Sequence, residues 1–258
     1  MKVYIIANQK GGVAKTTTAI NLAAGLGIRG YRVLLIDMDP QENATFSLLG
    51  QQSLTPSVYE WLMDEEDTLS LAEVIRPSTQ PGVDIIPSHI DLSGAEVELI
   101  TLVGGQLVLR RRLNSLRQGN HYDYVIIDPP PSLGILTING LAAADKVIIP
   151  VNASVFALTG IKKLLQTIRK VSTMLNHPDL QIGGVLCTFQ DQTHIARDTF
   201  TQVKEYFGGQ VYQTVIPKNV SLEEAHSRAM SVFTYAPQSA GAQAYAALVQ
   251  EVLDRDQA

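Results

Sequence analysis

The sequence has one cysteine, few charged residues and no long apolar run. Cys187, the single cysteine among 258 residues, excludes an internal disulfide and any metal site built on a cysteine cluster. No stretch approaches the roughly 20 consecutive apolar residues of a membrane-spanning helix. The first residues do not resemble a signal peptide. We therefore expect a cytoplasmic protein without a membrane partner.

An excess of positive charge is also absent. The net charge is −5, which argues against an overall basic DNA-binding protein, so any contact with DNA requires a local basic patch. Hydrophobic residues make up 45% and charged residues 17%, as is typical of a globular protein. The length suits one large domain over residues 1–258, with ample material for a buried core.

A strand, a glycine turn and a helix are predicted at the start of the chain. Residues 3–7 form an apolar run of strand length, and apolar residues recur at helical spacing from Ala19 onward. This is the context of a phosphate-binding loop, in which glycines let consecutive backbone N–H groups point at an anion and the helix N-terminus adds its dipole. The loop residues expected to bind a nucleotide are Lys10, Gly11, Gly12, Val13, Ala14, Lys15, Thr16 and Thr17.

Two residues of this loop carry distinct chemistry. Lys15 is expected to reach the terminal phosphates as a point charge, and the Thr16 hydroxyl to bind Mg²⁺. The spacing departs from the plain P-loop pattern, because Gln9 and Ala14 stand where its two glycines belong. A Cβ beside the phosphates is tolerable with a negative φ, so we expect a negative φ at Ala14.

Aspartates follow two further predicted strands. Residues 32–36 end before Asp37-Met38-Asp39, and residues 124–127 end before Asp128 and three prolines. In open α/β sheets the carboxyl ends of parallel strands face the ligand crevice. Asp39 is thus placed to order a water, or a magnesium-bound water, near the γ-phosphate, and Asp128 to hold Mg²⁺ through water. The alternative for Asp39 is capping of the next helix.

The rest of the chain alternates strand and helix, as a parallel sheet requires. The expected strands are residues 83–87, 146–151, 182–188 and 211–216, and the expected helices are residues 58–63, 69–75, 92–116, 158–175, 195–207, 221–228 and 240–254. The acidic residues 64–67 are interpreted as a solvated loop. Arg110-Arg111-Arg112, with Arg117, is interpreted as a solvated face or, alternatively, as a contact with DNA.

These motifs together resemble those of one family. The first stretch resembles the deviant Walker A motif Lys-Gly-Gly-x-Gly-Lys-Thr-Thr of the ParA/MinD class of ATPases, with Lys10 as the signature lysine. Asp37-Met38-Asp39-Pro40-Gln41 resembles the family's Asp-x-Asp-Pro-Gln motif, and Asp128-Pro129-Pro130-Pro131 its Asp-x-Pro-Pro motif. The resemblance implies an α/β P-loop NTPase fold, a twisted mostly parallel β-sheet with helices on both faces.

The same resemblance implies a site and a cycle. ATP and Mg²⁺ would be the cofactors, with Lys10, Lys15 and Asp39 in catalysis and Thr16, Asp39 and Asp128 around the metal. ATP would close a homodimer in which Lys10 crosses to the partner's nucleotide. Pro217 and Asn219, in a segment that resembles Ile-Pro-Arg-Asn, are candidates for contact with adenine; a strand-ending turn is the alternative.

Other positions depart from the family pattern. Glu42 replaces a glycine in the string Asp-Pro-Gln-Gly-Asn-Ala-Thr, which here ends in Asn43-Ala44-Thr45. Relatives that bind DNA have arginines where this chain has Gln192 and Ser221. A rearranged basic patch would have to draw on Lys162, Lys163, Arg197, Lys204, Lys218 and Arg228.

The implied function is partition of plasmid or chromosomal DNA with a ParB-type partner, with nonspecific DNA binding and nucleoid association in the ATP state. One alternative is the same ATPase positioning a protein cargo, such as a microcompartment or receptor cluster. A MinD-like membrane ATPase would end in a basic amphipathic helix, whereas residues 240–258 are alanine-rich and acidic. A reductase like the nitrogenase iron protein would need cluster cysteines. A further alternative is a nucleotide-binding scaffold that does not hydrolyse ATP, and the presence of Asp39 makes hydrolysis the expectation.

Overall fold

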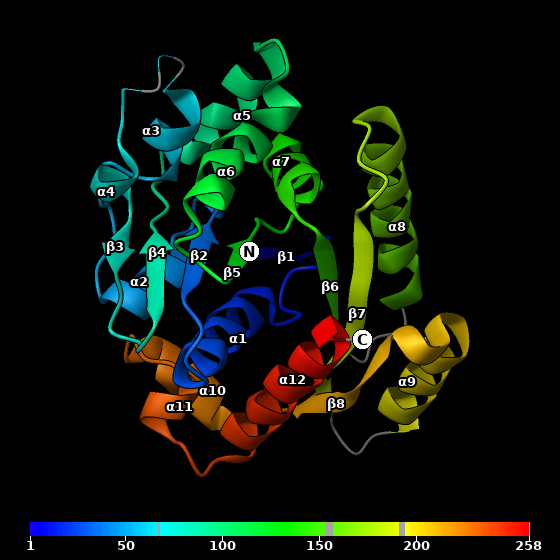
Figure 1. The fold of residues 1–258 in the computed structure, drawn as a ribbon. Helices are drawn as coiled ribbons and strands as arrows, with labels where there is room; N and C mark the ends of the chain where they lie inside the picture. The colour runs from blue at the N-terminus through cyan, green and yellow to red at the C-terminus, as the bar shows by residue number, and fades with distance from the viewer. Residues whose placement is uncertain (65, 67, 153–156, 191–193, 258) are drawn as a thin grey trace.

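A central sheet organises the molecule. The computed structural model describes residues 1–64, 66, 68–152, 157–190 and 194–257. Within these residues eight strands form one sheet in the order β3-β4-β2-β5-β1-β6-β7-β8 (Figure 1). The paired strands run parallel except for β3 against β4. Their bounds are β1 Lys2–Ile6, β2 Val33–Asp37, β3 Arg76–Pro77, β4 Val83–Ile86, β5 Tyr124–Asp128, β6 Lys146–Asn152, β7 Gln181–Gln190 and β8 Val211–Pro217.

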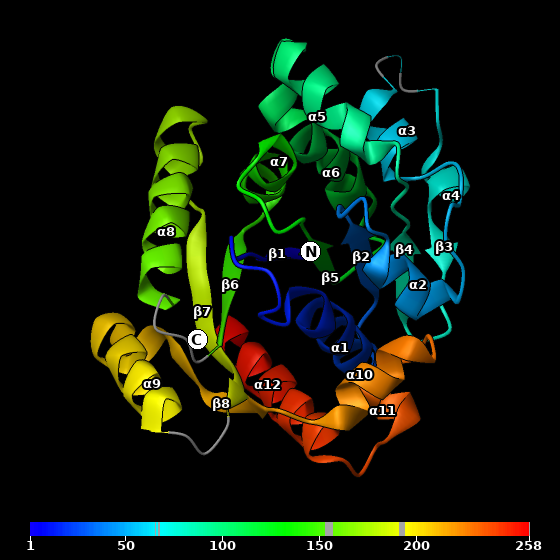
Figure 2. The same cartoon turned by 180° about the vertical axis from the view of Figure 1, so that it is seen from behind.

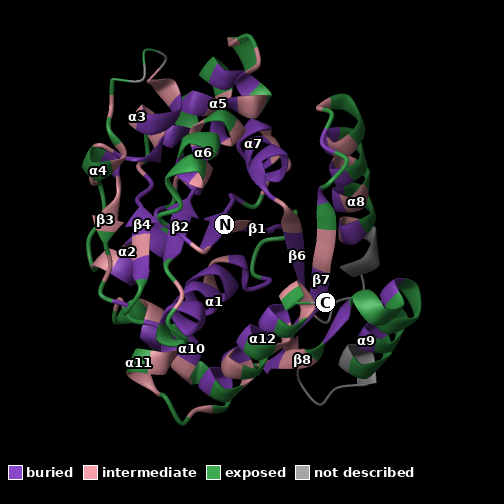
Figure 3. Ribbon diagram, in the orientation of Figure 1, coloured by how far each residue is buried: buried purple, intermediate pink, exposed green. Residues whose placement is uncertain are grey.

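The central strands are buried on both faces. Every residue of β2 and β5 is buried, which explains why their sequences are continuous apolar runs rather than alternating patterns (Figure 3). The register between these strands places Asp37 directly opposite Asp128. Since β1 pairs with β5 on the other side, the loop after β1 opens at the same edge of the sheet as both aspartates.

Helices cover both faces of the sheet (Figures 1 and 2). On one face α1, α2, α10, α11 and α12 contribute to one hydrophobic cluster, and on the other α3 to α9 contribute to a second. The expected fold class is therefore confirmed. The bounds are α1 Lys15–Ile28, α2 Asn43–Leu49, α3 Val58–Met63, α4 Leu71–Val74, α5 Leu92–Thr101, α6 Val108–Gly119, α7 Ile135–Ala143, α8 Ala157–Met174, α9 His194–Phe207, α10 Val220–Ser227, α11 Val232–Tyr235 and α12 Ala240–Gln257.

The expectation of one helix over residues 92–116 is wrong. The chain leaves α5 at Thr101, makes a short 3-10 turn at Gly105–Leu107 and starts α6 at Val108. Gly104 has a φ of +71°, and a Cβ on Gly105 would lie 1.8 Å from the carbonyl oxygen of Leu99. This turn therefore needs glycine at both positions: a left-handed backbone at one and a close backbone approach at the other.

Sequence patterns do not predict α2, α7, α11 or β3. In α7 every residue but Ile138 is buried, so the helix has no polar face and shows no amphipathic period. The short β3 contains Pro77, a residue confined to the edges of sheets.

The acidic segment is not simply a solvated loop. The Asp64 carboxylate, 10% exposed, accepts hydrogen bonds from Thr68 and Leu69 and lies 3.9 Å from the Arg112 guanidinium. Glu65 and Asp67 lie outside the described residues. In the basic run, Arg111 is exposed, whereas Arg117 pairs with Asp145 at 2.7 Å.

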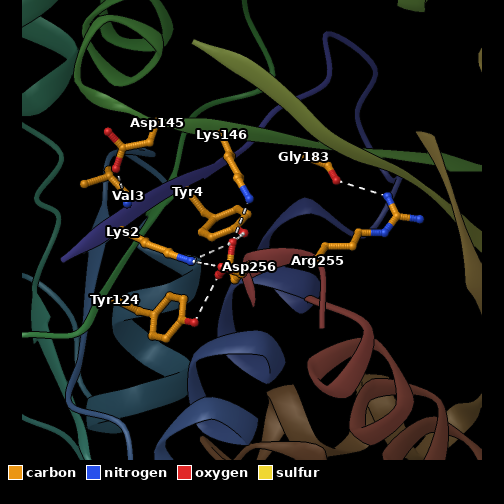
Figure 4. A network of polar contacts seen from close by, with 9 residues as sticks. All are labelled: Lys2, Val3, Tyr4, Tyr124, Asp145, Lys146, Gly183, Arg255 and Asp256. Carbon is orange, nitrogen blue, oxygen red and sulfur yellow. Dashed lines mark hydrogen bonds and ion pairs between the residues drawn. The ribbon is translucent and has the colours of Figure 1, made fainter. Parts of the chain in front are cut away.

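The last helix is hydrogen-bonded to residues near the amino ends of the central strands. Asp256 of α12 accepts hydrogen bonds from Lys146 Nζ at 2.7 Å, Tyr4 Oη at 2.7 Å and Tyr124 Oη at 3.0 Å (Figure 4). Burial alone would raise the pKa of Asp256, but these bonds and the charge of Lys146 outweigh it, so the pKa lies below its ordinary value. No helix among the described residues is long and apolar enough to cross a membrane.

Replacing Asp256 by asparagine removes the charge at the centre of this network. We expect the free energy of unfolding at pH 7, measured in urea, to fall by about 2–3 kcal/mol. The unfolded pKa is about 3.9 and the folded pKa is lower, so the stabilisation is complete above the unfolded pKa and is lost as pH falls through the folded value. The difference between wild type and Asp256→Asn should therefore shrink in acid.

Asp254→Asn is the matched control on the same helix. The exposed Asp254 carboxylate accepts a hydrogen bond from Gln250 at 2.8 Å. Its replacement should change the free energy of unfolding by less than about 0.5 kcal/mol. Equal losses in the two variants would contradict the importance of the Asp256 network.

Candidate nucleotide site

Neighbouring strands hold the loop between β1 and α1. The Asn8 side chain donates to the Pro150 carbonyl at 2.7 Å and accepts from the Lys10 N–H at 3.1 Å. The Thr188 hydroxyl, near the end of β7, donates to the Val13 carbonyl at 3.2 Å. A Cβ built on Gly11 or Gly12 would meet no atom within 4 Å. The loop is thus anchored from behind and open in front, as a phosphate cradle must be.

Ala14 has a positive φ. Its φ and ψ are +64° and +35°, at the residue that precedes α1, so the expectation of a negative φ is wrong. Left-handed backbone costs an L-residue roughly 1–2 kcal/mol, and such strain is typical of functional sites. Glu42, the other replacement of a family glycine, likewise has a φ of +57°, and its carboxylate accepts the Ser53 N–H at 2.5 Å. Both residues therefore have the left-handed backbone that favours glycine.

Lys15 points into the site. Its residue is 7% exposed, and its Nζ lies 3.4 Å from the Lys10 carbonyl oxygen. Burial lowers the pKa of Lys15, while the charges of Asp128 and Asp39 act in the opposite direction. The desolvated ammonium group favours binding of an anion, whereas the two carboxylates beside it favour a cation.

Asp128 has a buried carboxylate. The residue is fully buried, and neither of its carboxylate oxygens has a partner among the described residues. Burial raises the pKa of Asp128 well above its usual range; the charges of Asp37 and Asp39 add to this, while the nearby Thr16 and Lys15 oppose it. An unpaired buried carboxylate beside a hydroxyl fits the oxygen ligands that Mg²⁺ prefers.

This arrangement fits Mg²⁺ bound together with a nucleotide. The described residues contain no cluster of three or more His, Cys, Asp or Glu side chains that could hold a metal ion alone. Mg²⁺ commonly takes one or two protein ligands, several waters and the phosphates of its substrate. Thr16 and Asp128 would supply the protein side of such a site.

Asp39 does not cap the next helix. The N-cap of α2 is Glu42, whereas the Asp39 carboxylate accepts the Gln41 N–H at 3.0 Å. The Asp39 N–H donates to Asp37 at 3.1 Å. Burial raises the pKa of Asp37 to about 7, opposed by its hydrogen bonds from Thr45 and Asp39. Asp39 is 7% exposed at the carboxyl edge of the sheet. Since Glu42 is the N-cap of α2, the alternative that Asp39 caps this helix is wrong.

Comparisons with known proteins agree with this geometry. A family model described as an AAA domain matches residues 1–182. The chain is 46% identical over 253 residues to the sporulation initiation inhibitor protein Soj of Bacillus subtilis, covering 97% of this chain and 98% of that protein. It is 44% identical over 256 residues to the chromosome-partitioning ATPase Soj of Treponema pallidum, covering 99% and 98%. The chain belongs to the ParA/Soj family.

A solved relative carries the expected ligands. The structure of cobyrinic acid a,c-diamide synthase from Mycobacterium smegmatis, with an ATP analogue and magnesium bound, matches with a TM-score of 0.85 and 36% identity. The match covers 100% of this chain and 96% of that one. Together with the family relationship, this confirms an ATPase with ATP and Mg²⁺ as cofactors.

In this ParA/Soj-family chain the signature lysine lies at the surface. Lys10 is exposed, and its Nζ donates to Asn152 Oδ1 at 3.1 Å. Asn152, the last residue of β6, also approaches the Gly12 carbonyl at 3.5 Å. No motif marks Asn152 in the sequence, because its contacts arise from the pairing of β6 with β1.

The adenine candidates form a strand-ending turn. Pro217 is the last residue of β8, and Asn219 caps α10 by accepting the Ser221 N–H at 3.0 Å. Both residues are half-buried, and their contact with the base stays a prediction. Ser221 is half-buried on α10, while Gln192 lies outside the described residues.

Ala14→Gly should relieve the strain in the phosphate loop. We expect the free energy of unfolding to rise by about 1 kcal/mol, because glycine adopts a positive φ without the Cβ penalty. Ala247→Gly is the matched control: Ala247 is exposed inside α12, where glycine should cost about 1 kcal/mol. Thermal or urea unfolding of the nucleotide-free proteins measures both, and destabilisation of equal size in the two variants would contradict the strain at Ala14.

Proposed function

We propose that this partition ATPase forms a homodimer on binding ATP, binds DNA nonspecifically and segregates plasmid or chromosomal DNA with a ParB-type partner. The observation that carries the proposal is the exposed Lys10 on a loop that is anchored from behind and open in front. A lysine at this surface is available to a second copy of the chain. The cytoplasm is the proposed compartment, with nucleoid association in the ATP state.

Hydrolysis would proceed by in-line attack of a water on the γ-phosphate. Lys15 would hold the terminal phosphates, and Lys10 from the second copy would neutralise charge on the transferring group. Asp39 would orient the attacking water. Mg²⁺, held through Thr16 and Asp128, would draw negative charge from the phosphate oxygens.

The molar mass in solution tests the switch. With ADP we expect a monomer of 28.1 kDa by light scattering after size exclusion. A non-hydrolysable ATP analogue with Mg²⁺ should double the mass of wild type but not of Lys10→Ala. Lys170→Ala, a change of the same kind at an exposed position of α8, should dimerise like wild type. A molar mass that is the same with ADP and with the ATP analogue would contradict ATP-dependent dimerisation.

Binding to DNA is proposed through a local basic patch. The candidate residues, all exposed, are Lys162, Lys163, Arg197, Lys204, Lys218 and Arg228. They would replace the two arginines of DNA-binding relatives, whose positions hold Gln192 and Ser221. The attraction would be electrostatic and therefore weakened by salt.

Removing two lysines should change the salt dependence of DNA binding. We expect the double variant Lys162→Ala/Lys163→Ala to lower the slope of log affinity against log salt by about 1 for each phosphate that is no longer neutralised. A gel-retardation titration with ATP analogue and duplex DNA measures it. Arg110→Ala/Arg111→Ala, on α6, removes the same charge elsewhere and tests the other candidate run. Absence of binding at low salt would end the DNA proposal.

Three alternatives to the partition of DNA are considered. An ATPase that positions a protein cargo would need the same ATP-dependent dimerisation. An adaptor protein would select the cargo. A MinD-like membrane ATPase is disfavoured, because α12 buries Tyr245, Leu248 and Val252 against the fold instead of presenting a free apolar face. The solved relative named as a cobyrinic acid a,c-diamide synthase is 36% identical to this chain, whereas the Soj proteins are 44–46% identical. We therefore propose partition of DNA rather than the reaction of that synthase.

A further inference from the structure

Thr45 connects three segments at the carboxyl edge of the sheet. It lies in the first turn of α2 and is fully buried. Thr45 is not among the residues expected from the sequence to bind the nucleotide or magnesium. Its position, between the end of β2 and the end of β4, suggests a different role.

The Thr45 hydroxyl uses both of its hydrogen-bonding functions. It donates to Asp37 Oδ2 at 2.7 Å and accepts the Ser88 N–H at 2.8 Å. The Thr45 N–H also donates to Asp37 Oδ2 at 2.8 Å. Since Ser88 follows β4 and Asp37 ends β2, the side chain joins two neighbouring strands just beyond their last paired residues.

The other carboxylate oxygen of Asp37 is hydrogen-bonded to the backbone of Asp39. Asp37 Oδ1 accepts the Asp39 N–H at 3.1 Å. The Asp39 carboxylate itself accepts a local hydrogen bond, from the Gln41 N–H. The position of Asp39 therefore depends on its backbone, and that backbone is held by Asp37, which Thr45 holds in turn.

We propose that Thr45 is a positioning residue for ATP hydrolysis, which acts through Asp37 to place the carboxylate of Asp39. The inference rests on the proposed catalytic role of Asp39. It separates two properties of the site: the phosphate loop binds the nucleotide, whereas the Ser88–Thr45–Asp37–Asp39 chain of hydrogen bonds sets the rate of hydrolysis. A displacement near 1 Å can cost on the order of 100-fold in rate.

The test compares two substitutions of similar size. Thr45→Val keeps the shape but loses the hydroxyl, and we expect kcat to fall about 10- to 100-fold. The dissociation constant for a fluorescent ATP analogue should stay within about twofold, since no contact with the phosphate loop is changed. Thr45→Ser keeps the hydroxyl and should retain kcat within about threefold.

Ser231→Ala serves as the control for loss of a buried hydroxyl. Ser231 is fully buried and donates to Gln80 at 2.6 Å, outside the hydrogen-bond chain that leads to Asp39. Its replacement should leave kcat unchanged. If Thr45→Val lowers kcat and weakens nucleotide binding together, and Thr45→Ser rescues neither, the residue is merely structural and the inference fails.

Asp39→Ala, measured in parallel, separates the inference from its premise. Full turnover in Asp39→Ala removes the proposed role of Asp39. Lost turnover in Asp39→Ala with full turnover in Thr45→Val overturns the role of Thr45 alone. If Thr45→Val does not fold, Asp37→Asn takes its place, because it alters the same acceptor. A lower kcat with unchanged nucleotide affinity then supports the inference, and an unchanged kcat overturns it.

Discussion

The parallel register of β2, β5 and β1 is the constraint on which the site depends. It places Asp37 opposite Asp128 and opens the phosphate loop at the same edge. Because the strands are buried on both faces, a register shift would exchange two sets of packed side chains and is strongly opposed. The chemistry of the site thus depends on strand pairing that the hydrophobic cores on either face determine.

The buried charges of the nucleotide site are not fully balanced by hydrogen bonds from the described residues. Among the described residues Asp128 has no hydrogen-bond partner, Lys15 is desolvated beside it, and Ala14 has a left-handed backbone. Each feature is unfavourable alone. A magnesium nucleotide would supply a cation to the carboxylate and an anion to the lysine. Far from this edge, the Asp256 network holds the amino ends of the strands (Figure 4). The Asp256 network, which stabilises the fold, therefore lies at the amino ends of the strands. The strained nucleotide site lies at their carboxyl ends.

Local sequence predicts much of this structure and fails where contacts are distant. The main strands and most of the longer helices follow from apolar runs, and the loop and aspartates follow from motifs. The break at Gly104–Gly105 does not, because the close approach of Gly105 to the Leu99 carbonyl arises from tertiary packing. The buried α7 has no polar face to reveal it. The expected sign of φ at Ala14 is wrong, because the anchored loop overrides the residue's intrinsic preference.

By itself the sequence determined the fold class, the family and the nucleotide chemistry, since apolar runs and a contiguous loop motif need no distant partner. The tertiary structure decided which groups meet. It connected Thr45 to Ser88 across two strand ends and joined Lys10 to Asn152. Among the described residues, it also left Asp128 without a partner. The physical reason is that hydrogen bonds and desolvation act over a few ångströms, between residues that only folding brings together.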